Sequence, residues 1–122
     1  MGSVKLGLLG YTCKNVGTNI RKPTADYSAD EYDFIMNTNL RSAFELAGLF
    51  YPLLAKSGRS NIVHVTSVAG LTPLRTGSIY GMTKTTLTQL TQNYWERIKG
   101  DLKQEEQVKA YSSCFNYKLF KL

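Results

Sequence analysis

The chain has 122 residues, of which 43% are hydrophobic, and its formal net charge is +6 at pH 7. This composition is typical of one globular domain and argues against a disordered chain. The basic residues are scattered and, after Lys99, alternate with acidic ones, which argues against a nucleic-acid partner. No stretch has the length of a membrane span, and Cys13 and Cys114 lack metal or disulfide spacing. We therefore expect a cytoplasmic protein with no metal site and no membrane or nucleic-acid partner.

The first clear element in the chain is a long helix. Residues 4–9 indicate at most one weak strand, and the polar residues 13–27 are typical of a loop. The run Ser28–Glu31 then has the spacing of a capping box, and apolar residues recur at steps of three and four over residues 29–55. One residue, Asn39, interrupts this apolar stripe. Since a buried amide is costly without hydrogen-bond partners, we expect Asn39 to have some.

A strand and a second helix follow. Residues 62–66 are apolar and β-branched, which predicts a central strand of a parallel sheet, after a turn at residues 56–61. His64, the only histidine, is interpreted as structural because no acidic motif lies beside it. After a loop at residues 67–76, the sequence predicts a second helix over residues 78–99.

The last residues carry weaker signals. The charged residues 101–109 indicate a solvated helix, and residues 115–119 alternate like a strand. Along the chain, helix and strand alternate in the order typical of an open α/β sheet. Ligands of such sheets bind at the carboxyl ends of the strands. Ser67 directly follows the predicted strand, so we expect it at that edge of the sheet.

Ser67, Tyr80 and Lys84 have side chains suited to carbonyl or alcohol chemistry. Four residues apart on a helix, the phenol of Tyr80 and the ammonium of Lys84 would lie on one face. A fixed cation beside a phenol favours the phenolate, which helps the phenol to donate a proton near neutral pH. The hydroxyl of Ser67 would hydrogen-bond the same reacting oxygen. A surface pair at helical spacing is the alternative interpretation of Tyr80 and Lys84.

These residues resemble the active-site pattern of the short-chain dehydrogenase/reductase family, in which a serine precedes a Tyr-x-x-x-Lys motif. Ser67, Tyr80 and Lys84 match this pattern at the usual separation, and Asn39 matches the family's active-site asparagine. The sequence around these residues is most similar to the plant tropinone-reductase-like branch of the family. The segments that carry this similarity are Asn15–Thr24 and Val63–Gly70. In total the similarity covers residues 14–92.

The resemblance implies a role for each of these residues. Tyr80 would donate a proton in carbonyl reduction, and Ser67 would orient the substrate carbonyl. Lys84 would assist Tyr80 and hold the ribose of a nicotinamide cofactor. Asn39 would anchor a water that relays protons to the lysine, or would be a buried structural amide. The implied cofactor is NADP(H), and the implied substrate is a small ketone or alcohol. The residues implied to bind the cofactor are Asn15, Gly17, Tyr80 and Lys84.

The flanks of the chain depart from the family pattern. Before Cys13 the only glycines are Gly2, Gly7 and Gly10, so the glycine-rich turn that receives the cofactor pyrophosphate is not recognisable. The resemblance therefore implies an α/β fold: a partial, Rossmann-like, doubly wound parallel sheet that lacks the N-terminal dinucleotide-binding half. We expect a single partial domain, residues 1–122, with family-like residues 14–92 and divergent ends at residues 1–13 and 93–122.

Three hypotheses about function stay open. The first is the family reaction, the NADP(H)-dependent reduction of a small ketone to an alcohol. Under it we expect this truncated chain to be inactive, because hydride transfer needs a bound nicotinamide. The second is a non-catalytic remnant that forms a homo- or hetero-oligomer through the helices at residues 29–55 and 78–99. The third is a truncated gene product without a function. The sequence specifies neither the substrate nor the choice between NADP and NAD.

Overall fold

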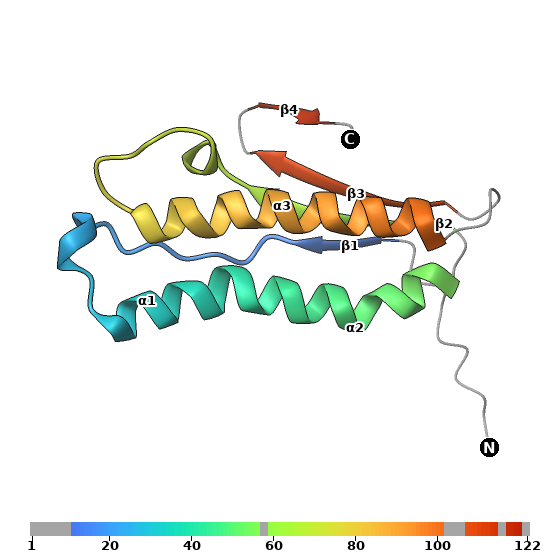
Figure 1. Cartoon of the computed structure of the whole chain (residues 1–122), viewed down its shortest axis with the longest axis horizontal. Helices are drawn as coiled ribbons and strands as arrows, with labels where there is room; N and C mark the ends of the chain where they lie inside the picture. The colour runs from blue at the N-terminus through green and yellow to red at the C-terminus, as the bar shows by residue number, and fades with distance from the viewer. Residues whose placement is uncertain (1–10, 57–58, 102–106, 115–116, 121–122) are drawn as a thin grey trace, which may run out of the picture.

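A computed structural model describes residues 11–56, 59–101, 107–114 and 117–120 of the chain (Figure 1). The strands are β1 (Tyr11–Lys14), β2 (Arg59–Thr66), β3 (Gln107–Cys114) and β4 (Tyr117–Phe120). The helices are α1 (Ala29–Met36), α2 (Ser42–Lys56) and α3 (Ser78–Asp101), with short helical turns η1 (Thr24–Asp26), η2 (Asn37–Arg41) and η3 (Val68–Gly70). None of these helices is long and apolar enough to cross a membrane.

The strands form one four-stranded sheet in the order β1-β2-β3-β4. β1, β2 and β3 are parallel, and β4 runs antiparallel to β3. The predicted strand at residues 62–66 is therefore confirmed as a central parallel strand. Its alternate residues Ile62, His64 and Thr66 are buried, whereas Val63 and Val65 are only half-buried. The chain thus has the expected partial, Rossmann-like α/β architecture.

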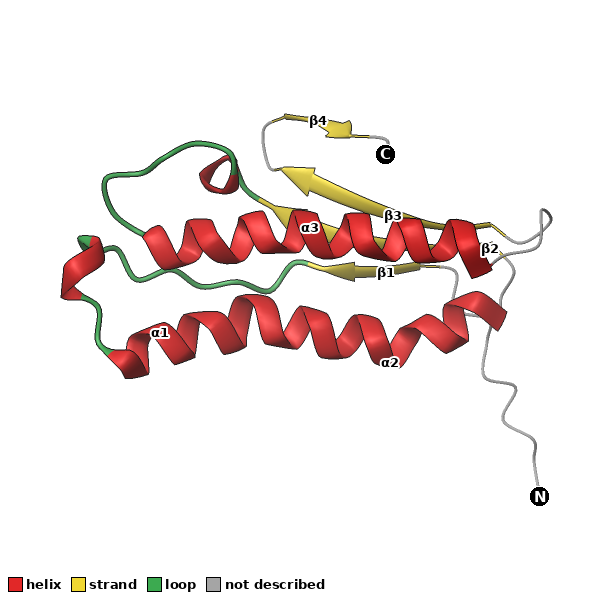
Figure 2. Ribbon diagram, viewed as in Figure 1, coloured by secondary structure: helices red, strands yellow, loops and turns green. Residues whose placement is uncertain are grey.

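The helices lie over the face of the sheet on which Ile62 is buried. α2 contacts β1 and β2, α3 contacts β2 and β3, and α1 contacts α3. The chain passes from β1 to β2 to β3 in one direction across the sheet, and right-handed crossovers then place both connecting helices on the same face. Figure 2 shows this single helical layer against the strands. All three parallel strands end at the same edge, where the loops after β1 and β2 begin.

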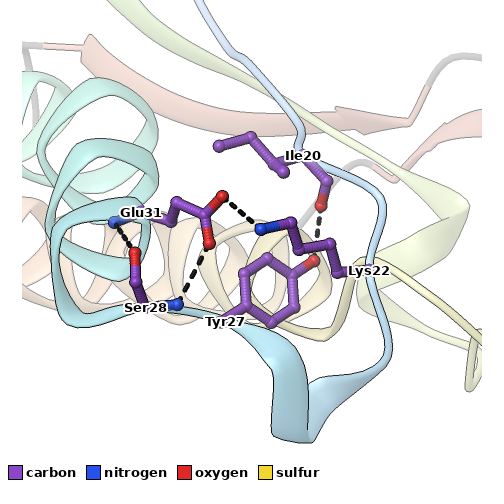
Figure 3. Close-up of polar contacts among 5 residues, drawn as sticks. All are labelled: Ile20, Lys22, Tyr27, Ser28 and Glu31. Carbon is purple, nitrogen blue, oxygen red and sulfur yellow. Dashed lines mark hydrogen bonds and ion pairs between the residues drawn. The ribbon is translucent and has the colours of Figure 1, made fainter.

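The predicted long helix is present, with an irregular turn at its centre. Its capping box forms as expected: the Glu31 amide donates to Ser28 Oγ at 3.2 Å, and the Ser28 amide donates to Glu31 Oε2 at 3.0 Å (Figure 3). Between α1 and α2 the backbone widens into the π-helical turn η2, where the amide of Ser42 donates to the carbonyl of Asn37. This turn contains Asn39, the residue that interrupts the apolar stripe.

Several predicted boundaries are wrong. The loop predicted at residues 13–27 begins too early, because Cys13 and Lys14 belong to β1. The turn predicted at residues 56–61 is too long, because β2 begins at Arg59. In each case the strand includes a few residues with weak strand preferences, because these residues pair with a neighbouring strand. The neighbouring strand comes from a distant part of the chain, so the local sequence does not reveal the pairing.

Of the two elements predicted near the C-terminus, the helix is wrong in part and the strand is confirmed in part. Residues 107–109 belong to β3 and not to a helix, because they pair with residues 59–61 of β2. The predicted strand at residues 115–119 is confirmed over residues 117–119, which belong to β4. The weak strand predicted at residues 4–9 lies outside the described residues.

Candidate active site

The predicted site residues meet at the carboxyl edge of the sheet. A cavity of about 240 Å³ there is lined by Asn15 and Gly17 after β1, by Val65, Thr66 and Ser67 at the end of β2, and by Tyr80 and Lys84 in the first turns of α3. Ser67 therefore lies at the sheet edge where its position after the strand predicts it. Asn39 does not line this cavity and lies behind Gly17.

The ammonium of Lys84 is held at the back of this cavity. Its residue is 5% exposed, and Nζ donates to the carbonyl of Val65 at 3.0 Å. The same nitrogen lies 5.4 Å from the centroid of the Tyr80 ring, within the range of a cation–π contact. The expected proximity of ammonium and phenol is thus present, and β2 supplies the carbonyl that orients the lysine.

Gly17 keeps the space in front of the lysine open. A Cβ atom at this position would lie 3.3 Å from Lys84 Nζ and 3.5 Å from Asn39 Oδ1. A larger side chain would therefore have to displace the ammonium or the amide, or fill the cavity itself. This gives a physical reason for a glycine in the loop after β1.

The side chain of Asn39 fixes that loop. It is fully buried, and its Oδ1 accepts from the amide of Thr18 at 2.7 Å. Its Nδ2 donates to the carbonyl of Thr18 at 2.8 Å and to Oγ1 of Thr83 at 3.2 Å. The expected partners of this buried amide are therefore present. Both Nδ2 hydrogens serve protein acceptors, so the side chain ties the loop that carries Gly17 to α3.

Ser67 caps the short turn η3, which packs closely on α3. Ser67 Oγ accepts from the amide of Ala69 at 3.2 Å. A Cβ on Gly81 would lie 2.8 Å from the carbonyl oxygen of Ala69, and one on Gly70 would lie 2.8 Å from the amide nitrogen of Thr85. The two glycines therefore allow backbone to meet backbone, which fixes Ser67 relative to the start of α3.

A second cavity, of about 600 Å³, adjoins the first. Gly17, Ser67 and Tyr80 line both. The larger cavity continues toward solvent, where the exposed residues Arg21 and Arg75 contribute to its wall. Sequence reasoning missed these two arginines, because each lies in a loop and no local pattern relates them. The hydroxyl-bearing residues Ser67 and Tyr80 thus lie between the smaller cavity, which Lys84 lines, and the larger cavity, which is open to a ligand.

His64 lies apart from this chemistry. It is 1% exposed, and Nδ1 lies 2.9 Å from Oγ1 of Thr91. Thr91 Oγ1 itself donates to the carbonyl of Leu87, so the imidazole Nδ1–H is the donor to Thr91. Burial, with a smaller effect of the Lys14 charge, lowers the pKa of His64 to about 4. This environment supports the interpretation of His64 as structural. Among the described residues, no group of three histidine, cysteine or acidic side chains could hold a metal ion.

Comparisons with known proteins agree with this geometry. The family model for short chain dehydrogenases matches residues 3–112. This range is wider than residues 14–92, over which the sequence itself shows the resemblance. A tropinone reductase homolog of Arabidopsis thaliana is 56% identical over 87 residues, which are 71% of this chain and 33% of the relative. Senescence-associated protein 13 of the same plant is 46% identical over 93 residues, or 76% of this chain and 35% of the relative. The chain thus spans about a third of the length of these curated relatives.

Solved structures show the same fold at lower identity. A short chain dehydrogenase/reductase from Burkholderia phymatum in complex with NAD matches with a TM-score of 0.81 and 21% identity, over 88% of this chain and 38% of that chain. A structure of ElxO with NADP bound gives 0.79 and 19%, over 88% and 42%. The chain belongs to the short-chain dehydrogenase/reductase family, in its tropinone-reductase-like branch.

Proposed function

We propose that the described residues form the proton-transfer and nicotinamide-facing part of an NADP(H)-dependent reductase site for a small ketone. One observation carries this proposal: the hydroxyl-bearing residues Ser67 and Tyr80 line two adjoining cavities, and Lys84 lies in the smaller one. One cavity would take the nicotinamide end of the cofactor and the other the ketone. Relatives and similar structures support the choice of cofactor and substrate class.

The chain's own residues would supply the proton and the orientation. Bound NADPH would supply a hydride to the carbonyl carbon. Tyr80 would donate its phenolic proton to the carbonyl oxygen, so that ketone, hydride and proton together give the alcohol. Ser67 would donate a hydrogen bond to the same oxygen, since its Oγ already accepts from Ala69 and its hydrogen is available. The ammonium of Lys84 would stabilise the phenolate left behind.

The smaller cavity fits one end of the cofactor. Asn15, Gly17 and Lys84 form walls with donors and acceptors suited to ribose hydroxyls, and a Cβ on Gly17 would occupy this space. Among the described residues, no glycine-rich turn joins a strand to the start of a helix, so groups for the pyrophosphate are not found there. We therefore expect the chain alone to bind the cofactor weakly and to turn over little or no ketone.

Reduced nicotinamide mononucleotide tests this proposal, since it lacks the adenosine half. Followed by nicotinamide fluorescence, it should bind with an affinity similar to that of NADPH. In Gly17→Val both affinities should fall by at least about tenfold, because the added side chain fills the cavity. Val16→Ala, a change at the exposed neighbour, is the control and should leave both unchanged. Saturable binding that Gly17→Val does not weaken, or binding of neither compound, would contradict the proposed site.

A second proposed function is pairing with another copy or a longer relative through the outer faces of α2 and α3. A groove of about 490 Å³ lies between α3 and the segment that runs from the end of α1 through η2 to the start of α2, and it is lined in part by Leu40, Phe44 and Leu90. Phe44 and Leu49 on α2 are 60% and 70% exposed, and a partner that covers these large apolar side chains would gain free energy from their burial. Such a contact would form a helical interface.

Pairing predicts a dimer that a charge in the groove disrupts. In sedimentation velocity, Phe44→Glu should convert the dimer into a monomer, because a charged carboxylate would replace the apolar ring and would lose its hydration when the partner covers it. Leu71→Glu places the same charge at an equally exposed loop residue and should leave the dimer intact. A wild-type chain that stays monomeric at all concentrations tested, both alone and when mixed with a full-length relative, would refute the pairing.

A further inference from the structure

The larger cavity contains two arginines that the proposed reduction does not use. We propose that Arg21 and Arg75 bind a carboxylate, so that the substrate is an oxo acid whose ketone faces Ser67 and Tyr80. This inference rests on the proposed function for the identity of the reacting end. The binding of the anionic end rests on the charges and the loop structure around the cavity alone.

Arg21 lies between Ile20 and Lys22, and both of these residues are anchored to side chains at the start of α1 or just before it (Figure 3). The hydroxyl of Tyr27 donates to the carbonyl of Ile20, and Nζ of Lys22 pairs with Glu31 at 2.5 Å. Lys22 is thereby committed to the acidic first turn of α1. Arg21, between these two anchors, lines the cavity instead. Its backbone position is therefore fixed, although its guanidinium remains exposed.

Arg75 reaches the cavity from the loop before α3. That loop is joined to the Arg21 segment, because the amide of Gly77 donates to the carbonyl of Lys22 at 3.2 Å. Gly77 has a φ of 83°, a conformation that favours glycine, and the side chain of Asn19 lies against it. The two arginine-bearing loops thus form one wall, although 54 positions separate the arginines in sequence. Backbone contacts that do not involve the arginine charges therefore hold both residues at the wall of the same cavity.

Among the described residues, the charged side chains that line the two adjoining cavities are all basic. The lining residues include no aspartate or glutamate among those described, and the adjoining cavity adds the ammonium of Lys84. Neither Arg21 nor Arg75 forms an ion pair with an acidic side chain of the described residues. An arginine presents a planar fork of donors that matches a carboxylate. A cavity whose charged lining residues are all cations attracts an anion and raises its local concentration.

The hydroxyl-bearing residues and the arginines lie at different depths in the larger cavity, which gives the proposed substrate an orientation. Ser67 and Tyr80 are half-buried at the boundary with the smaller cavity, whereas both arginines are exposed. A volume of about 600 Å³ lies within the usual range of roughly 300–1,000 Å³ for small-molecule sites. A short oxo acid would therefore place its ketone on the inner hydroxyls and its carboxylate on the outer guanidiniums. A neutral ketone would leave the arginines to water.

Paired ligands test the carboxylate without any cofactor. Pyruvate, acetoacetate and levulinate vary the distance from ketone to carboxylate, and their methyl esters remove the charge. By chemical-shift titration of the Thr18 and Thr76 amides, at least one acid should bind about tenfold more tightly than its ester. Arg21→Gln and Arg75→Gln should each reduce this preference to about twofold or less and leave ester binding unchanged. Added salt should weaken the acid and not the ester.

Lys56→Gln is the matched control for net charge, because Lys56 is the exposed last residue of α2. That end of α2 lies away from the loops after β1 and before α3 (Figure 1). It should retain the preference for the acid; equal losses in all three variants would refute the inference. Acids and esters that bind alike would also refute it. If pyrophosphate displaces the acid only while Lys84 is present, the acid binds at the lysine and not at the arginines, which would also refute the inference. If acids bind preferentially but no nicotinamide compound binds, the proposed reduction fails while the carboxylate site stands. If nicotinamide compounds bind but acids and esters bind alike, the carboxylate site fails while the proposed cofactor site stands.

Discussion

Replacing Asn39 by alanine should lower the free energy of unfolding by about 3 kcal/mol. The change removes three hydrogen bonds made by one fully buried side chain. It leaves both the amide and the carbonyl of the half-buried Thr18 without their partner, and an unpaired group costs roughly 1–3 kcal/mol, with the smaller values where water has access. Urea denaturation followed by far-UV circular dichroism measures the loss.

Asn37→Ala is the matched control, because Asn37 starts the same π-helical turn but is exposed. This variant should change the free energy of unfolding by less than about 0.5 kcal/mol. If Asn39→Ala were no more destabilising than Asn37→Ala, the amide would not hold the loop after β1. Since that loop carries Gly17, Asn39→Ala should also weaken the binding of reduced nicotinamide mononucleotide. A role confined to a water relay would leave both stability and binding unaffected.

Local patterns in the sequence predict the elements that build the centre of the site. The capping box at Ser28 and the apolar strand around Val65 are both present. The four-residue spacing of Tyr80 and Lys84 on one helix predicts their proximity without any knowledge of the sheet. These features depend on residues a few positions apart, so one sequence contains enough information to find them.

Features that depend on distant segments could not be predicted in this way. β3 contains polar residues and exists because it pairs along the whole length of β2. The π-helical turn at Asn39 has no local signal beyond a polar residue on an apolar stripe, and its partner Thr18 is 21 positions earlier. Arg21 and Arg75 lie in two loops joined by the contact between Lys22 and Gly77. Each of these contacts is set by the tertiary fold and not by neighbours in sequence.

His64 should make the chain markedly less stable as the pH falls from neutrality. Its pKa is about 4 in the folded chain, below the ordinary value of 6.5, chiefly because of burial and secondly because of the Lys14 charge. Between these values the unfolded chain binds a proton that the folded chain does not, so folding becomes less favourable as the pH falls. The stability is complete above about pH 6.5, and about 3 kcal/mol is lost by about pH 4.

Denaturation from about pH 7 to about pH 5 isolates this effect, since about 2 kcal/mol of the loss falls in that interval. Glu31 titrates lower: hydrogen bonding from Lys22 depresses its pKa below 4.5, so its contribution is lost only as the pH falls through that depressed value. His64→Gln removes the titrating imidazole but keeps a donor for Thr91, and its stability should change by less than about 0.5 kcal/mol over the same interval. Equal pH dependence in both proteins would mean that the imidazole accepts a proton without unfolding. Burial of His64 would then fail to exclude the charge.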